Sequence, residues 1–202
     1  MWTELFGRPR PEKIICVGLN YRAHSAEQNV QAPERPLLFA KWPNTLIGAD
    51  EPIVLPPITS QVDYECELGV VMAGPGEVWG YTCVNDVSAR DLQFADGQWV
   101  RGKSLDTFCP VGPHIETQLD PTNALVETRV NGSLRQSGRT SLMAYPVAYL
   151  VRWISRVMTL FPGDLIATGT PAGVGPLVAG DNVEVSVSDV GVLRNPVQSA
   201  QT

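Results

Sequence analysis

The hydrophobic positions of this chain fall mostly into short runs that glycine and proline separate. The runs that we predict as strands are residues 13–18, 37–41, 53–55, 62–72, 79–85, 165–168 and 183–187. The chain has 18 glycines and 17 prolines, spread along its length as turns between strands require. Asn131-Gly132 separates two further strand-like runs and is typical of a tight hairpin, because both central residues of such a turn adopt positive φ. The pattern predicts a mainly β protein with a few helices.

Apolar residues at helical spacing predict one longer helix, from Pro146 to Met158. A shorter helix is expected between residues 21 and 28. Another is expected to begin at Ser88, where Asp91 three residues later suggests a capping box. Residues 195–202 are predicted to be a flexible tail. No internal repeat and no interdomain linker interrupts the pattern, so we expect a single domain spanning residues 1–202.

Composition and charge exclude several classes of partner. The formal net charge is -6, which argues against nucleic acid or an anionic membrane as the main partner. No stretch is long and apolar enough to span a bilayer, and the first residues lack an apolar signal core, so we expect a cytoplasmic protein. The four cysteines form no C-x-x-C pair and are expected to be free, buried thiols.

Two glutamates one residue apart, Glu65 and Glu67, lie in the run 62–72. Side chains alternate between the faces of a strand, so these carboxylates share one face, and Cys66 points to the other. Adjacent carboxylates repel each other, and a cation would hold them together. Asp86, at the next strand-to-helix junction, is the candidate third ligand, and three oxygen ligands suit Mg²⁺ or Mn²⁺ better than zinc. The pattern is also typical of a solvated strand edge, so spacing alone leaves both interpretations open.

Other polar residues are candidates for chemistry around such a site. His24 and Glu27 lie three residues apart, on one face of a helical turn, where the carboxylate would orient the imidazole as a general base. A surface pair in a flexible loop explains the same spacing. Lys103 is either an exposed loop residue or a cation beside the carboxylates. The loop 169–175 lacks a P-loop ending but allows a ligand to approach the backbone closely, with Thr170 as a donor.

Several segments, taken in order, resemble the fumarylacetoacetate hydrolase family. They are Lys13–His24, Asp63–Val70, Gly80–Gln93, Gln98–Pro110, Val130–Gln136 and Leu165–Gly175. The resemblance implies the mixed β-sandwich roll of the family's C-terminal catalytic domain, with residues 1–12 as a short N-terminal remnant. It also implies a homodimer.

The resemblance further implies the residues of the site. Positions matching the family's metal ligands are Glu65, Glu67 and Asp86, for Mg²⁺ or Mn²⁺. The implied catalytic residues are His24, Glu27 and Lys103, and the implied substrate-binding residues are Arg22, Gln93 and Thr170.

The activity that the resemblance implies is enolate chemistry on a small 2-oxo or 1,3-dioxo acid, with a metal-stabilised enolate. We expect cleavage of a C–C bond, by hydrolysis or decarboxylation, in a substrate such as an acylpyruvate or oxaloacetate, because His24 and Glu27 match a water-activating pair. One alternative is an isomerase, or tautomerase, of 2-hydroxyhepta-2,4-diene-1,7-dioate. A second is a catalytically idle metal-binding scaffold, although His24, Glu27 and Lys103 are all retained.

Overall fold

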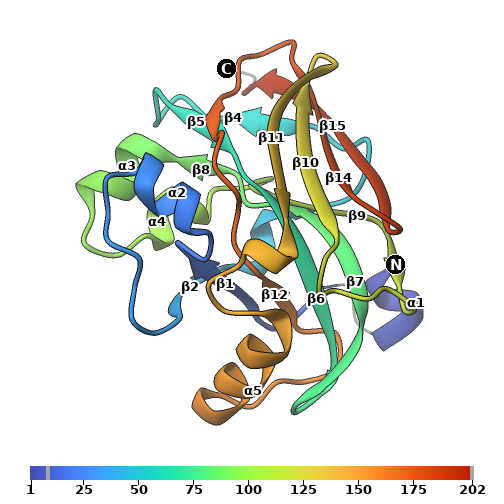
Figure 1. Ribbon diagram of the computed structural model, residues 1–202. Helices are drawn as coiled ribbons and strands as arrows, with labels where there is room; N and C mark the ends of the chain where they lie inside the picture. Colours follow the sequence, from blue (N-terminus) through green and yellow to red (C-terminus); the bar gives the residue numbers. More distant parts are fainter. Residues whose placement is uncertain (8–9, 201–202) are drawn as a thin grey trace.

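The strands of this chain form three sheets; a computed structural model describes residues 1–7 and 10–200 (Figure 1). The seven-stranded sheet has the order β2-β1-β12-β6-β7-β9-β3, formed by β1 (Ile14–Gly18), β2 (Leu37–Lys41), β3 (Leu46–Ile47), β6 (Cys66–Gly74), β7 (Glu77–Asn85), β9 (Cys109–Glu116) and β12 (Leu165–Ala167). The five-stranded sheet has the order β11-β10-β14-β15-β4, formed by β4 (Ile53–Leu55), β10 (Leu125–Val130), β11 (Ser133–Arg139), β14 (Asn182–Val187) and β15 (Gly191–Ser199). A small third sheet, β13-β5-β8, consists of β5 (Val62–Tyr64), β8 (Ser88–Ala89) and β13 (Gly175–Pro176).

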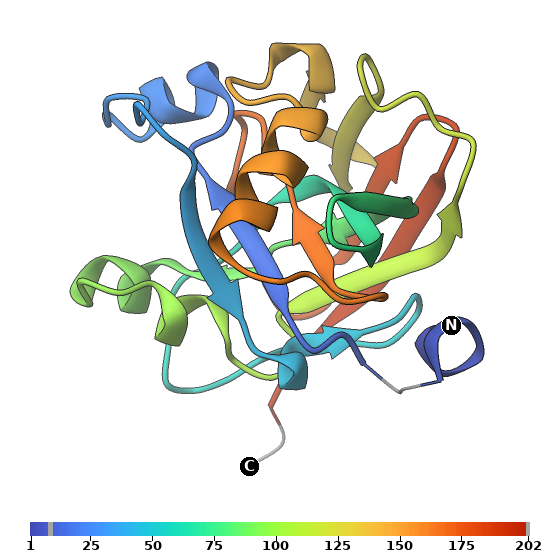
Figure 2. The same cartoon turned by 90° about the horizontal axis from the view of Figure 1, so that it is seen from below.

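The described helices are few and mostly short. They are α1 (Trp2–Phe6), α2 (Arg22–Glu27), α3 (Arg90–Ala95), α4 (Val100–Lys103) and α5 (Val147–Val157), with the 3₁₀ turns η1 (Pro43–Thr45) and η2 (Thr140–Leu142). Seen from below, α5 lies across the strands of the large sheet (Figure 2). None of the helices in the described part of the chain is long and apolar enough to cross a membrane. The predicted mainly β fold with few helices is confirmed.

One apolar core joins the two larger sheets and α5. The buried stripe of α5 contains Val147, Leu150, Val151 and Ile154. It belongs to the same cluster as residues of both sheets, among them Ile15, Val17, Leu68, Val70, Ile166, Val126, Val185 and Leu193. Because the sheets bury their inner faces against each other and against α5, the site-bearing ends of β1, β6 and β7 rest on a closely packed core.

The predicted hairpin is confirmed, and the predicted tail is wrong. Asn131 and Gly132 have φ of 51° and 78° and join β10 to β11. Residues 195–199 belong to β15, which pairs with β14 and, in parallel, with β4. Asn195 is buried there and donates to the carbonyl oxygens of Gly48 and Glu51. The polar residues after 195 suggested a tail, but pairing with β14 and β4 makes residues 195–199 part of a strand. Residues 201–202 lie outside the described part of the chain.

The predicted capping box is also wrong. The helix begins at Arg90, and Ser88 belongs to β8, where its hydroxyl donates to the Asp86 carbonyl oxygen at 2.9 Å. Asp91 instead accepts hydrogen bonds from the hydroxyl of Thr59 and from the backbone amide and hydroxyl of Ser60. Pairing of β8 with β5 delays the helix by two residues, because those residues complete the small sheet.

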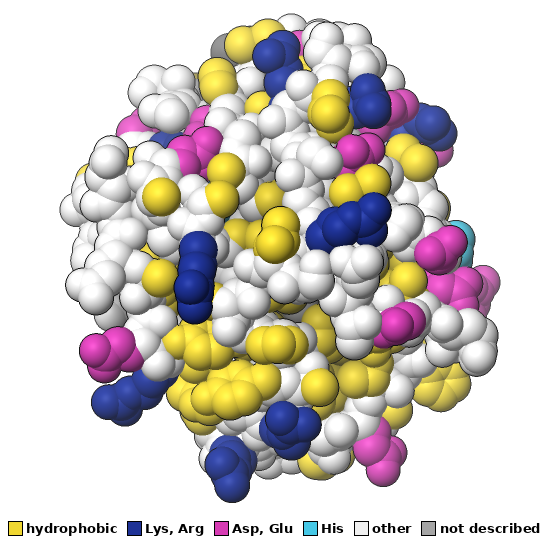
Figure 3. Space-filling view, viewed as in Figure 1, with side chains coloured by type: hydrophobic (Ala, Val, Ile, Leu, Met, Phe, Trp, Pro, Cys, Tyr) yellow, Lys and Arg dark blue, Asp and Glu magenta, His cyan; other side chains and the backbone are white. Residues whose placement is uncertain are grey.

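Exposed hydrophobic side chains gather over and beside α5 on the face seen in Figure 3. Tyr149 and Val157 on this helix, and Phe161 just after it, are exposed. A concentration of apolar surface is typical of faces that contact another protein. The homodimer that the family resemblance implies stays a prediction.

Candidate active site

The structure brings Glu65, Glu67 and Asp86 together. One carboxylate oxygen of each lies within 4.8 Å of the others, and all three side chains are buried. A solvated strand edge is therefore excluded as the explanation of the Glu65–Glu67 spacing. Three carboxylates gathered out of water form a donor set for a hard divalent cation.

Local backbone pairing places the three carboxylates. Glu65 lies in the gap between β5 and β6, and its amide donates to the Asn85 side-chain oxygen at 3.0 Å. In return, the Asp86 amide donates to the Glu65 carbonyl oxygen at 2.9 Å. Cys66 is fully buried on the opposite face, in the main core, as the alternation of strand side chains predicts. The core on one face thus holds the carboxylates on the other.

Two buried lysines neutralise part of this charge. Lys103, at the end of α4, places its Nζ 2.7 Å from a carboxylate oxygen of Glu65 and 2.7 Å from one of Asp86. Lys41, at the end of β2, contacts the other oxygen of Asp86 at 2.6 Å and donates to the Val87 carbonyl oxygen at 2.9 Å. Lys103 is thus a buried cation at the carboxylates and not an exposed loop residue.

Helix α3 supplies the third cation, Arg90. Its Nε donates to Asp63 at 2.9 Å, and Nη2 forms an ion pair with Glu65. The remaining terminal nitrogen, Nη1, donates to the side-chain oxygen of Gln93 at 2.9 Å. A Cβ at Gly102 would lie 2.7 Å from the backbone nitrogen of Gln93, so glycine there allows α4 to approach α3 closely. That approach puts Lys103 of α4 and Arg90 of α3 on the same carboxylate, Glu65.

The ionisation of the carboxylates shows where a further cation fits. Burial raises the pKa of Glu67 well above its ordinary value, and the negative charges of Asp86 and Glu65 raise it further. The Gly169 amide, which donates to Glu67 at 2.7 Å, offsets only part of this. Burial also opposes the ionisation of Glu65, but Arg90 and Lys103 outweigh it and hold the pKa below its ordinary range. The residues present therefore fit a divalent cation, placed where it compensates Glu67.

This arrangement predicts a pH dependence in metal-free protein. The pKa of folded Glu67 is raised, so the folded state holds this proton more tightly than the unfolded state does. As the pH rises from about 4.5 through the raised value, the free energy of unfolding should therefore fall. The lowered pKa of Glu65 acts in the opposite direction, but its contribution is complete above the ordinary value of 4.5. Urea denaturation in EDTA should show the fall, and saturating Mg²⁺ should abolish it. A fall of the same size with Mg²⁺ would contradict the assignment.

The predicted dyad forms on α2. His24 Nδ1 lies 3.1 Å from a carboxylate oxygen of Glu27, whose other oxygen accepts from the Gly173 amide at 2.9 Å. His24 is buried, so the surface-pair explanation of this spacing does not hold. Thr170, in the same glycine-rich loop, accepts from the Gln136 amide group at 2.7 Å, which leaves its own O–H available for the predicted donor contact with a ligand. The loop thus ties the dyad to β11.

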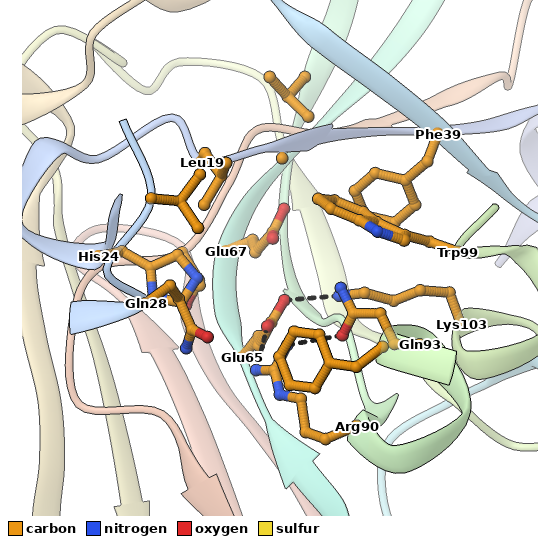
Figure 4. A pocket seen from close by; sticks show the side chains of 15 residues that line it. Leu19, His24, Gln28, Phe39, Glu65, Glu67, Arg90, Gln93, Trp99 and Lys103 are labelled. Atoms are coloured by element: carbon orange, nitrogen blue, oxygen red, sulfur yellow. Dashed lines mark hydrogen bonds and ion pairs between the residues drawn. The ribbon is translucent and has the colours of Figure 1, made fainter. Parts of the chain in front are cut away.

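A small cavity of about 100 Å³ opens beside these residues (Figure 4). Its charged and polar lining comprises Glu65, Glu67, His24, Gln28, Arg90, Gln93, Lys103 and Thr170, and its apolar lining comprises Val17, Gly18, Leu19, Val30, Phe39, Phe94 and Trp99. In Figure 4, His24 stands across the cavity from Lys103 and Gln93, with Glu65 and Glu67 between them. Drug-sized ligands occupy cavities of roughly 300–1,000 Å³, so this one suits a substrate of few atoms.

Of the residues predicted for the site, the structure brings all but two to the carboxylates or the cavity. Glu27 acts on the cavity only through its contact with His24. The other is Arg22, whose exposed side chain lines a different surface depression, together with Tyr145. Sequence reasoning missed Lys41, Arg90 and Asp63. The sequence held a signal for two of them. Lys41 is a charged residue at the end of the apolar strand 37–41, and Arg90 lies three residues before Gln93, a spacing that places both side chains on one helix face.

Comparison with known proteins connects this site to a family. Residues 13–198 match the family model described as the C-terminal domain of fumarylacetoacetate (FAA) hydrolase. The chain belongs to the fumarylacetoacetate hydrolase family. The matched region contains every residue of the carboxylate cluster, the dyad and the cavity, so the site described above lies within the family domain.

Similar proteins of the family include isomerases. A solved 5-carboxymethyl-2-hydroxymuconate delta-isomerase from Mycobacterium smegmatis is 47% identical, with a TM-score of 0.88 over 95% of this chain and 80% of that one. A 2-hydroxyhepta-2,4-diene-1,7-dioate isomerase from Mycobacterium marinum is 45% identical, with a TM-score of 0.87 over 95% and 76%. The mitochondrial oxaloacetate tautomerase Fahd2a of Rattus norvegicus is 42% identical over 93% of this chain and 67% of its own length. These names favour the isomerase alternative over the expected C–C bond cleavage.

Proposed function

We propose that this protein is a divalent-metal-dependent isomerase that interconverts the keto and enol forms of a small 2-oxo acid. The observation that carries the proposal is the buried cluster of Glu65, Glu67 and Asp86, which opens on a small cavity facing the His24–Glu27 dyad. The names of the similar isomerases and of the oxaloacetate tautomerase support the same reaction class.

The cation that fits this oxygen donor set is Mg²⁺ or Mn²⁺, held by Glu65, Glu67 and Asp86. When bound, it would supply Lewis acidity that favours negative charge on a substrate oxygen. Lys103 and Arg90 add fixed positive charge at the same wall of the cavity, where it stabilises an enolate without rearrangement during the reaction.

His24 is the group that moves the proton. Glu27 engages Nδ1, which leaves Nε2 to take a proton from the carbon beside the 2-oxo group and to pass it to the enolate oxygen, which gives the enol; the reverse transfer restores the keto form. Because the second oxygen of Glu27 is tied to the Gly173 amide, the carboxylate holds the imidazole in one orientation.

C–C bond cleavage is the second candidate, because the same dyad can deprotonate a water molecule. Both reactions pass through an enolate, and their products differ: tautomerisation conserves the carbon skeleton, whereas hydrolysis or decarboxylation shortens it. An idle scaffold would show neither outcome. Product analysis therefore separates the three alternatives.

Deuterium exchange tests the proposal. In D₂O with Mg²⁺, the protein should accelerate exchange of the C3 protons of oxaloacetate and of acetylpyruvate, followed by proton NMR, and EDTA should abolish the acceleration. His24→Gln should reduce it by about 10²–10⁴-fold, the usual effect of losing a general base. His114→Gln is the matched control, because His114 is exposed and does not line the cavity. Equal exchange by wild type and His24→Gln would contradict the assignment, and release of pyruvate would favour cleavage.

A further inference from the structure

Asn20 lies at the junction between β1 and α2, shortly before His24 in the sequence, and its side chain does not line the cavity. Resting on the function proposed above, we propose that Asn20 is a positioning residue whose side chain sets the place of His24 relative to Glu67. Because Asn20 does not reach the cavity, it acts through the helix that it precedes and not on the substrate.

The side-chain amide of Asn20 has one possible orientation. Its nitrogen donates to the carbonyl oxygens of Thr168 at 2.7 Å and Tyr145 at 3.1 Å, and its oxygen accepts from the Tyr145 backbone amide at 2.9 Å. Backbone carbonyl groups only accept and backbone N–H groups only donate, so the two ends of the amide cannot be exchanged. Asn20 is 0% exposed, which removes competition from bulk water. Its side chain is therefore a fixed bridge between distant segments.

The Thr168 end of this bridge belongs to the carboxylate cluster. Both the backbone amide and the hydroxyl of Thr168 donate to the carbonyl oxygen of Leu68, at 3.2 and 2.8 Å. The next residue, Gly169, donates its amide to a carboxylate oxygen of Glu67 at 2.7 Å. These bonds hold the segment to β6 independently of Asn20. Removal of the Asn20 side chain should therefore leave Glu67 in place and release the other end of the bridge.

Two backbone features bring Asn20 close enough to form the bridge. A Cβ at Gly169 would lie 2.6 Å from the Cβ of Asn20, and Gly169 has a φ of 101°, so glycine is required there. Leu19 has a φ of 56°, a left-handed conformation that is costly for leucine and persists only where the surrounding structure enforces it. This strained turn carries the chain from β1 towards α2 and places Asn20 against the loop that follows β12.

Helix α2, which carries His24, is tied at both ends to the same segment, residues 168–173. Before the helix, Asn20 donates to Thr168, and at its last residue the carboxylate of Glu27 accepts from the Gly173 amide at 2.9 Å. The same segment holds Glu67 through the Gly169 amide. It therefore sets the separation between the base and the carboxylates, which face one cavity from different elements in Figure 4.

The other contacts of this junction are made by the backbone, and they survive substitution of the Asn20 side chain. The Ala144 amide donates to the Asn20 carbonyl oxygen at 2.7 Å, and Tyr21 forms a β-bridge with Met143. Asn20→Ser should therefore fold, but with α2 displaced at its first turn. A displacement of about 1 Å is enough to slow a proton transfer by about 10²-fold.

The kinetics of Asn20→Ser test the proposal. In D₂O with saturating Mg²⁺, kcat for exchange of the C3 protons of oxaloacetate should fall by about 10²-fold, while KM changes by less than about threefold. Affinity for Mg²⁺, measured by calorimetry, should remain that of wild type, because Glu67 keeps its contact with Gly169. An unchanged kcat, or a parallel loss of Mg²⁺ affinity, would overturn the inference.

Asn195→Ser is the matched control. Asn195 is a similarly buried asparagine whose side-chain nitrogen also donates to two carbonyl oxygens, those of Gly48 and Glu51, both at 2.8 Å, and it does not line the cavity. Both variants should unfold at lower urea concentrations than wild type, but only Asn20→Ser should lose kcat. Equal losses of kcat in the two variants would assign the effect to general stability and reject the positioning role.

Combination with His24→Gln tests whether Asn20 acts through the base. If it does, the double variant should exchange the C3 protons no more slowly than His24→Gln alone, because the group that Asn20 positions is already lost. Independent effects would instead multiply, so that the double variant loses about another 10²-fold, and would contradict the positioning role.

Failure of this inference is distinguishable from failure of the proposed function. The imidazole signals of His24, followed by NMR without substrate, should shift in Asn20→Ser and not in Asn195→Ser. Such a shift in a protein that exchanges no C3 protons would support the positioning role and reject the isomerase. Exchange that is equally fast in wild type and Asn20→Ser would support the isomerase and reject the positioning role.

Discussion

Arg90→Met is expected to lower the free energy of unfolding by about 3–5 kcal/mol. Arg90 is buried and pairs with Asp63 and Glu65, both of which are buried as well. Methionine fills a similar volume but leaves two carboxylates without their shared cation, and removal of one partner from a buried ion pair leaves the full desolvation cost of the other. Urea denaturation of wild type and variant, both in EDTA, measures the difference.

A surface arginine provides the comparison for this prediction. Arg101 forms an ion pair with Asp96 at 2.7 Å, but both side chains are substantially exposed. Arg101→Met should therefore leave the urea midpoint nearly unchanged, because water and salt screen the pair. Adding Asp63→Asn to Arg90→Met should restore part of the lost stability. The explanation by buried charge would be wrong if both single variants unfolded at the same urea concentration.

Glu67→Gln should have two effects of opposite sign. Without metal, the variant should be more stable than wild type at neutral pH, because burial and the neighbouring carboxylates make the Glu67 charge unfavourable. With Mg²⁺, it should gain little stability and lose roughly 10³-fold in the rate of C3 proton exchange, which corresponds to about 4 kcal/mol of transition-state stabilisation. Thermal denaturation with and without Mg²⁺, together with the NMR exchange assay, measures both effects.

The change in stability without metal and the change with Mg²⁺ together distinguish a metal ligand from a structural residue. A merely structural residue would lose stability in both conditions, whereas a metal ligand that is unfavourable without its ion gains stability in one and loses it in the other. Glu77→Gln is the control, since Glu77 is exposed at the start of β7 and should change neither quantity. Retained stabilisation by Mg²⁺ in Glu67→Gln would exclude Glu67 as a ligand.

Features of short sequence range were predictable, and the structure shows why. Alternation along a strand places Glu65 and Glu67 on one face and Cys66 in the core, and this depends only on backbone geometry. The His24–Glu27 contact follows in the same way from the three-residue spacing on a helical turn. The errors arose where long-range pairing overrides local preference, as in the strand that incorporates Asn195.

The sequence by itself determined the class of fold, the carboxylate pair, the dyad and, through its ordered motifs, the family. Only the tertiary structure decided which charges compensate one another. Lys41 and Asp86 lie 45 positions apart and Arg90 and Asp63 lie 27 apart, so no local spacing reveals their contacts. The same packing leaves Arg22 outside the cavity and brings Leu19, Phe39 and Trp99 into its lining. Net charge and shape in a buried site are sums over distant segments, and those sums exist only after the chain has folded.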